Sequence, residues 1–232
     1  FLEFMEILGD QEFLVPERQD PYVRTHPLTR DRVAVIAHHV ANSPYSDNAV
    51  SPKFDINFRR ARAKLYGFLS PIGHTLRVYK ESDNSLESRY ARAVGYYREP
   101  NLEKAVPLID GLIAEYPKDP YFRELKGQML FENGKPGAAL VSYQNAVTLL
   151  PDNPLIRREL ARVQLALNDP AMLDTAIDNL RISIADDSES PFTWRQLAIA
   201  YGRRGDKGHS SLALAEEALL TGKKSVALYH AG

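Results

Sequence analysis

The spacing of apolar residues predicts helices along nearly the whole chain. Ahead of residue 84, apolar residues recur every three or four positions in three segments, which we expect to be helices: 1–9, 29–41 and 55–69. Thr29 can cap the second segment, because its hydroxyl accepts a hydrogen bond from the free N–H groups of a first turn. A loop rich in turn residues, 42–52, separates the second segment from the third.

The third segment, 55–69, is amphipathic and basic. We expect it to dock by an apolar stripe made of Phe58, Ala61, Leu65 and Phe68 or Leu69. Its other side carries Arg59, Arg60, Arg62 and Lys64. A basic amphipathic helix also suits anionic lipid or RNA, but a surface helix docked by its apolar stripe is the more frequent case.

From residue 84 onward the chain repeats with a period of about 34 residues. Pro117 and Pro151 are 34 positions apart, and each precedes a helix start of one kind: Asp119-Pro120 and Asn153-Pro154, followed later by Ser190-Pro191. A short polar residue caps the first turn, and proline fits the first helical position because its missing N–H is not needed there. The period therefore marks one helical hairpin after another.

The interior of each repeat resembles the tetratricopeptide repeat. Trp194, Leu197, Ala198 and Tyr201 stand in the order W-x-x-L-A-x-x-Y, as in the first helix of that family. In the preceding unit, a three-residue insertion falls within 171–174. We predict repeats at 86–118, 120–152, 154–188 and 190–220, and a further helix beginning near Lys223. The expected fold is all-α, with a short helical segment over 1–83 and a tetratricopeptide-repeat superhelix, an α-solenoid, over 84–232.

Stacked first helices of such a solenoid line a concave face, which is a binding shape. Arginine forks and aromatic rings on that face suit extended peptides that carry carboxylates. Two plainer interpretations stay open: the arginines are solvated, and the tyrosines pack between repeats. The repeat register assigns to this face Tyr90, Tyr97, Arg98, Tyr121, Glu124, Gln128, Phe131, Arg158, Arg162, Arg195 and Arg203.

The amino-acid composition excludes several kinds of functional site. The 232 residues include no cysteine, which excludes disulfides, thiolate metal sites and a cysteine nucleophile. The formal net charge of −1 argues against a nucleic-acid partner, and no apolar run is long enough to be a transmembrane segment. The six histidines form no H-E-x-x-H pair, so we expect neither a catalytic residue, nor a metal ligand, nor a cofactor within this sequence.

One longer pattern resembles a known family. His26, Pro27 and Arg32 give H-P-x-x-x-x-R, and a helix, a loop, a basic helix and the repeats follow in order. This order resembles the C-terminal part of bacterial M48 zinc metallopeptidases that carry a tetratricopeptide tail, and the resemblance covers nearly the whole sequence. The amino-acid sequence of residues 120–147 and 192–206 resembles such repeat tails as well.

The resemblance implies properties that the residues alone do not. It implies that 1–83 is the end of a protease domain, with an H-E-x-x-H helix upstream of Phe1 in which zinc polarises the scissile carbonyl and glutamate activates water. It implies a periplasmic location and the outer-membrane assembly machinery as a partner. It also places His26 at the margin of the protease site, although a neutral imidazole at a loop–helix junction is the simpler expectation in this chain.

The chain begins and ends inside apolar periodic patterns, so we expect it to be part of a longer protein. The repeats and the family resemblance together suggest two alternative functions. The first is the non-catalytic C-terminal region of a zinc metalloendopeptidase, whose solenoid binds substrates or partners in envelope protein quality control. The alternative is a stand-alone repeat adaptor that binds peptides and has no associated protease. A lipid- or RNA-facing role of the basic helix is a weaker third hypothesis.

Overall fold

The structure is a computed structural model that describes residues 29–48 and 51–232. The chain divides into two compact units after Asp55. In the first unit, helix α2 (Thr29–Asn42) confirms the predicted second segment and extends it by one residue. The predicted helix over 1–9 and His26 lie outside the described residues.

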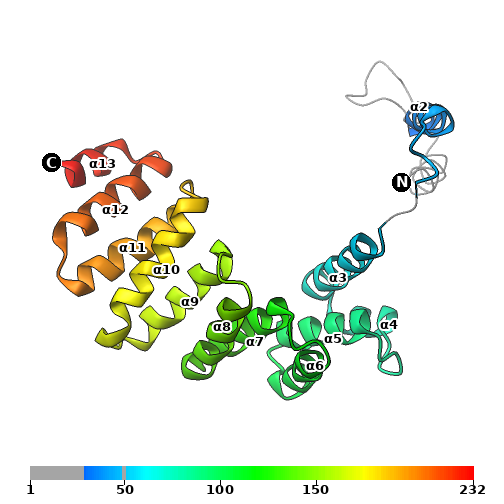
Figure 1. The fold of residues 1–232 in the computed structure, drawn as a ribbon, viewed down its shortest axis with the longest axis horizontal. Coiled ribbons are helices and arrows are strands. Elements are labelled where there is room, and N and C mark those ends of the chain that lie inside the picture. Colours follow the sequence, from blue (N-terminus) through cyan, green and yellow to red (C-terminus); the bar gives the residue numbers. More distant parts are fainter. Residues whose placement is uncertain (1–28, 49–50) are drawn as a thin grey trace. The chain divides into compact units, whose positions relative to one another are not determined.

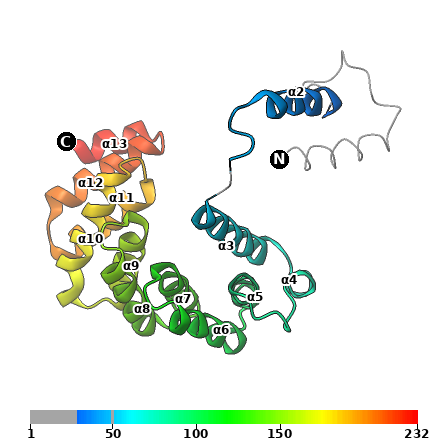
Figure 2. The same cartoon turned by 45° about the vertical axis from the view of Figure 1, so that its right-hand side comes forward.

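The second unit is a row of paired helices (Figures 1 and 2). Each predicted repeat contains one hairpin, and a further helix follows at the C-terminal end. The hairpins are α5 (Leu86–Arg98) with α6 (Leu102–Glu115), α7 (Pro120–Glu132) with α8 (Pro136–Leu149), α9 (Pro154–Leu167) with α10 (Leu173–Asp186), and α11 (Pro191–Arg204) with α12 (Lys207–Leu220), followed by α13 (Lys224–Ala231). The described residues contain no strand, and this architecture is the expected all-α solenoid.

The predicted start signals act as caps. The side chain of Asp119 accepts a hydrogen bond from the backbone N–H of Tyr121 at 2.9 Å, and Asn153 accepts one from Ile156 at 3.0 Å. Ser190 caps α11 in the same way. Proline occupies the first turn of all three helices, so local chemistry sets where each first helix begins.

Small residues sit where the helices of each hairpin approach each other. Ala139, Ala161, Ala176 and Ala198 are all almost fully buried, within a core that continues from repeat to repeat. The predicted insertion forms a short 3₁₀ helix, η2 (Pro170–Met172), and the left-handed backbone of Asn168 ends α9 just before it. The extra residues therefore lie in the turn and leave the packed helices in register.

Two helices precede the first repeat and pack on it. Helix α3 (Pro52–Leu69) begins three residues earlier than predicted, and α4 (Ile72–Val78) was not predicted because seven residues give too short a periodic pattern. Ala63 of α3 belongs to the core of the first repeat, and Gly67 lies against Ala91 and Val94 of α5. Small residues allow the two helix backbones to approach closely.

The predicted docking stripe of α3 is therefore wrong. Phe58, Leu65 and Leu69 are 56%, 59% and 75% exposed, and Ala61 is exposed as well. Only Phe68 of the predicted set packs on the core, where its ring meets that of Tyr97 edge-on at 6.0 Å between centroids. The fully buried residues of the helix are Ala63 and Gly67, which carry no strong hydrophobic signal, and Tyr66 and Phe68 pack beside them.

Among the described helices, none combines the length and the apolar character needed to cross a membrane.

Candidate partner-binding groove

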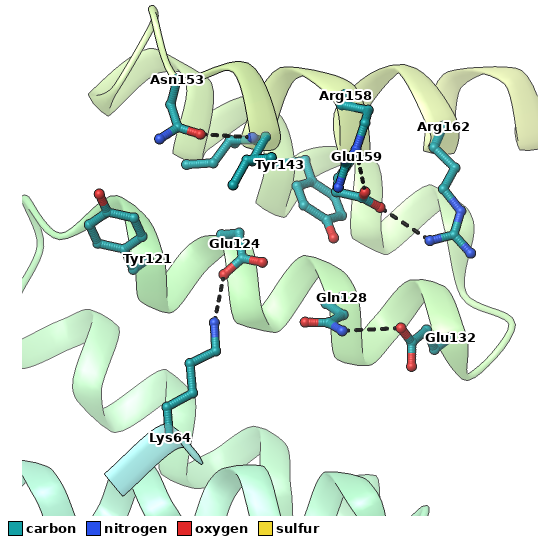
Figure 3. Close-up of a pocket in the computed structure, with 12 residues that line it drawn as sticks. Lys64, Tyr121, Glu124, Gln128, Glu132, Tyr143, Asn153, Arg158, Glu159 and Arg162 are labelled. Carbon is teal, nitrogen blue, oxygen red and sulfur yellow. Dashed lines mark hydrogen bonds and ion pairs between the residues drawn. The ribbon is translucent and has the colours of Figure 1, made fainter. Parts of the chain in front are cut away.

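A groove opens between the first helices of the second and third repeats (Figure 3). Its volume is about 340 Å³. Most of its lining comes from α7 and α9, with one side chain from α3 and one from α8. The lining residues are Lys64, Tyr121, Glu124, Gln128, Glu132, Tyr143, Asn153, Leu155, Ile156, Arg158, Glu159 and Arg162.

The helical register explains why these residues line it. Counted from the first residue of each first helix, the fifth position holds Glu124 in α7 and Arg158 in α9. The ninth position holds Gln128 and Arg162. Residues four apart share one face of a helix, so each first helix presents the same pair of positions to the groove. In α11 these positions are Arg195 and Ile199.

Arginines and phenylalanines form a cluster at the α9 side of the groove. The carboxylate of Glu159 accepts hydrogen bonds from Arg158 Nε and from Arg162 Nη1, both at 3.1 Å (Figure 3). The Arg162 guanidinium also lies 4.9 Å from the ring centroid of Phe131 and 5.9 Å from that of Phe192. These contacts hold the guanidinium planes in place while leaving N–H donors for a partner.

Glu124 and Tyr143 line the side of the groove opposite the arginines. Lys64 of α3 lies 3.5 Å from the Glu124 carboxylate, the ion pair drawn in Figure 3. Burial nevertheless raises the pKa of Glu124, and it raises the pKa of Tyr143 as well. Figure 3 shows the Tyr143 hydroxyl pointing between α7 and α9, toward the open groove.

Helix α3 covers the inner side of the first repeat. Tyr90 and Tyr97 of α5, predicted as groove residues, are only 3% and 5% exposed. The Tyr90 ring packs edge-on against Phe122 at 5.3 Å, and the Tyr97 hydroxyl donates to Glu132. Neither side chain is open to a partner as predicted, because the chain itself occupies that part of the concave face.

The other predicted residues are on the surface or partly buried. Tyr121 is 46% exposed, and the Gln128 amide donates to Glu132 at 3.1 Å. The remaining three are cations with intramolecular contacts: Arg98 lies 6.0 Å from the Phe68 ring, Arg195 pairs with Glu217 at 2.8 Å, and Arg203 donates to the carbonyl of Leu165 at 2.5 Å.

The basic side of α3 is engaged within the chain. Arg59 pairs with Glu87 at 3.0 Å, and Arg60 pairs with Asp119 at 2.6 Å while lying 4.7 Å from the Phe122 ring. Together with the Lys64 pair, three of the four cations bind acids on the repeats. These ion pairs reduce the net positive charge that α3 could present to RNA or lipid.

Sequence reasoning missed two groove residues, and one residue stacked on the groove arginines, that the register could have indicated. Glu159 holds both arginines, and Leu155 and Phe192 occupy equivalent positions in successive helices. Lys64 could not be found in this way, because its approach depends on how α3 packs. Across the described part of the chain, no three His, Cys, Asp or Glu side chains are grouped so as to hold a metal ion.

Comparison with known proteins agrees with this architecture. Residues 90–154 match the tetratricopeptide repeat family model. Two solved structures share the fold at low identity. YrrB, described as a TPR protein with an unusual peptide-binding site, is 18% identical with a TM-score of 0.58, over 74% of this chain and 89% of its own. MamA is 16% identical with a TM-score of 0.58, over 72% of this chain and 97% of its own.

Two curated relatives are similar in sequence. The β-barrel assembly-enhancing protease of Yersinia pestis is 27% identical over 97% of this chain and 46% of its own length. DnaJ homolog subfamily C member 3 of Gallus gallus is 29% identical over 37% of this chain and 17% of its own length. The chain thus spans less than half of either relative. These comparisons identify the fold as a solenoid of tetratricopeptide-type repeats with an assembly-enhancing protease among its distant relatives.

Proposed function

We propose that the chain binds segments of partner proteins in its groove, as the repeat region of an M48-like zinc metalloendopeptidase that acts in envelope protein quality control. The observation that carries the binding role is the arginine–phenylalanine cluster around Glu159. Arg158 is stacked on Phe192 with 5.4 Å between the guanidinium carbon and the ring centroid, and Arg162 is stacked on Phe131. A prearranged guanidinium loses little freedom when a carboxylate or a backbone carbonyl binds it.

The protease context is supported by sequence similarity. The alignment with the Yersinia pestis protease runs across both units of the chain rather than the repeats alone. The described residues offer no three-ligand cluster for zinc. In this proposal, the catalytic zinc belongs to the H-E-x-x-H helix that the resemblance implies upstream of this chain. A periplasmic location and a role in outer-membrane assembly belong to the same proposal.

Photo-crosslinking tests the binding role. A photoreactive amino acid is placed at Tyr121 in the groove and, as a matched control, at Val141 of α8, which is 56% exposed and outside the groove lining. Each protein is irradiated with an outer-membrane β-barrel protein freshly diluted from denaturant. Crosslinks from position 121 and few from 141 are expected. Equal crosslinking from both positions, or none, contradicts the proposal.

The protease context is tested separately, by reading the gene sequence upstream of this chain and by assaying the full-length product. The upstream reading frame should encode H-E-x-x-H, and the full-length product should contain stoichiometric zinc and cleave an unfolded β-barrel protein. An upstream frame without the motif would refute the protease context and leave the binding role intact.

A stand-alone adaptor is the alternative, and one observation favours it. The residues from Ile56 onward form a compact unit with a core of its own, in which α3 and α4 complete the first repeat. Limited proteolysis of the isolated chain distinguishes the two functions. Firm protection of residues 1–45 would favour the adaptor, whereas rapid cleavage there would favour a segment that packs on another domain.

A further inference from the structure

Four exposed apolar side chains occupy one equivalent position along the row of first helices. The second residue of α7 is Tyr121, that of α9 is Leu155 and that of α11 is Phe192, and they are 46%, 55% and 41% exposed. In α13 the matching residue is Val226, the third residue of that helix, which stands one repeat period of 34 residues after Phe192 and is 42% exposed. We call these four residues the apolar ladder.

The apolar ladder lies on the groove side of the first helices. Tyr121 and Leu155 both line the groove. Phe192 lies under the guanidinium groups of Arg158 and Arg162, which are the fifth and ninth residues of the preceding first helix. Phe192 thus adjoins the polar positions of the helix before it, and Leu155 lines the same groove as Glu124 and Gln128 of the helix before it, so apolar and polar side chains lie next to each other there.

Such a pattern indicates a ligand. Single exposed apolar residues are ordinary, but exposed apolar residues at one register position of successive repeats place apolar area at regular intervals along the row of first helices, and a partner gains by burying that area. Beside it, two arginines share the single carboxylate of Glu159, which leaves a positive charge over Phe192. A partner that satisfies both rows needs apolar side chains on one side and carboxylates close by.

We propose that the groove selects an extended segment that combines apolar residues with Asp or Glu, the apolar side chains contacting the apolar ladder and the carboxylates binding Arg158 and Arg162. This inference rests on the proposed function and names its ligand class. An extended chain fits because the ladder crosses one helix after another. Packed helices lie about 8–10 Å apart, and twelve extended residues reach about 40 Å, enough to cross four of them.

Panning a random twelve-residue phage-displayed peptide library on the full chain tests this ligand class. Peptides recovered by the wild-type protein should be enriched in both large apolar and acidic residues relative to the starting library. Arg158→Ala with Arg162→Ala should abolish the acidic enrichment and weaken a recovered acidic peptide about tenfold or more, the effect of losing one charge-assisted hydrogen bond. Leu155→Ser with Phe192→Ser should abolish the apolar enrichment.

Matched controls replace residues of the second helices. Arg181→Ala in α10 and Leu212→Ser in α12 change exposed side chains outside the groove lining and should leave both enrichments intact. Circular dichroism confirms that each variant is folded. The ligand class is wrong if wild type recovers basic or wholly polar peptides. It is also wrong if the groove variants select the same peptides as wild type. In both cases the proposed peptide binding itself is still supported. A wild-type protein that enriches no peptide at all contradicts the proposed function itself.

Discussion

The backbone of Gly127 packs directly against the ring of Tyr143. A Cβ atom built on Gly127 of α7 would be only 2.7 Å from two ring carbons of Tyr143 in α8. Tyr143 is itself 1% exposed, so its ring has no open space into which it could move. This contact brings the two helices of the second repeat close together and holds the tyrosine whose hydroxyl reaches the groove.

Replacing Gly127 by alanine should therefore destabilise the protein. Alanine favours a helix over glycine by up to about 1 kcal/mol, but an added methyl in a filled core costs about 1–3 kcal/mol. With the full helix gain subtracted, the expected net loss in the free energy of unfolding is about 0–2 kcal/mol, measured by urea denaturation. Gly137→Ala in α8 is the control, because a Cβ there meets nothing within 4 Å. A loss at both positions would show that the ring contact is not the cause.

Ala139→Leu should destabilise the same hairpin from its other helix. Ala139 is 0% exposed and packs in the core with Tyr143 and Ile156. Three additional carbon atoms would force neighbouring side chains out of their preferred rotamers, at about 1–3 kcal/mol. The neighbouring Ala138 is exposed, so Ala138→Leu should change stability by less than about 0.5 kcal/mol. Equal effects on thermal unfolding would mean that the repeat register is shifted by one residue.

The repeats could be predicted from the sequence because their signals are local. Asp119, Asn153 and Ser190 each cap a helix within three residues of themselves, and proline fixes the start of each first turn. The fifth and ninth positions of the first helices then follow by counting. Groove residues such as Arg158 and Arg162 were therefore found from their register, without knowledge of how the helices pack.

The docking of α3 could not be predicted in the same way. Hydrophobic periodicity selects Phe58 and Leu65, yet the helix packs through Ala63 and Gly67, which contribute close backbone approach rather than apolar area. That packing buries Tyr97 and places Lys64 beside Glu124. Such contacts between distant segments depend on shape, which a pattern of apolar and polar residues does not encode.

Gly67→Ala should release α3 from the first repeat. A Cβ at this position would lie 2.5 Å from the carbonyl oxygen of Ala91 and 2.9 Å from the Cβ of Val94, so one of the two helices must move. We expect faster amide hydrogen exchange in α3 and α5, with α9 to α12 unchanged. Gly73→Ala in α4 is the control, because a Cβ there meets nothing within 4 Å. Unchanged exchange in the Gly67 variant would show that α3 does not depend on this contact.

Glu124 gives stability a pH dependence of a specific sign. Burial raises the pKa of its carboxyl above the ordinary value of 4.5, so the folded state holds this proton more tightly than the unfolded state does. The contribution of Glu124 to stability is then largest below pH 4.5 and falls as the pH rises through the raised value in the folded state. Lys64 opposes the effect by attracting the carboxylate, but burial is the larger cause.

Urea denaturation of wild type and of Glu124→Gln between pH 3 and pH 7 measures this contribution. The free energy of unfolding of wild type minus that of the variant should fall as pH rises, because glutamine does not titrate. Glu115→Gln is the matched control of opposite sign. The pKa of Glu115 is lowered by its hydrogen bond from Arg89, so its contribution is present above pH 4.5 and is lost as the pH falls through the lowered value. Two differences that slope the same way would contradict the buried, weakly paired state of Glu124 at the floor of the groove.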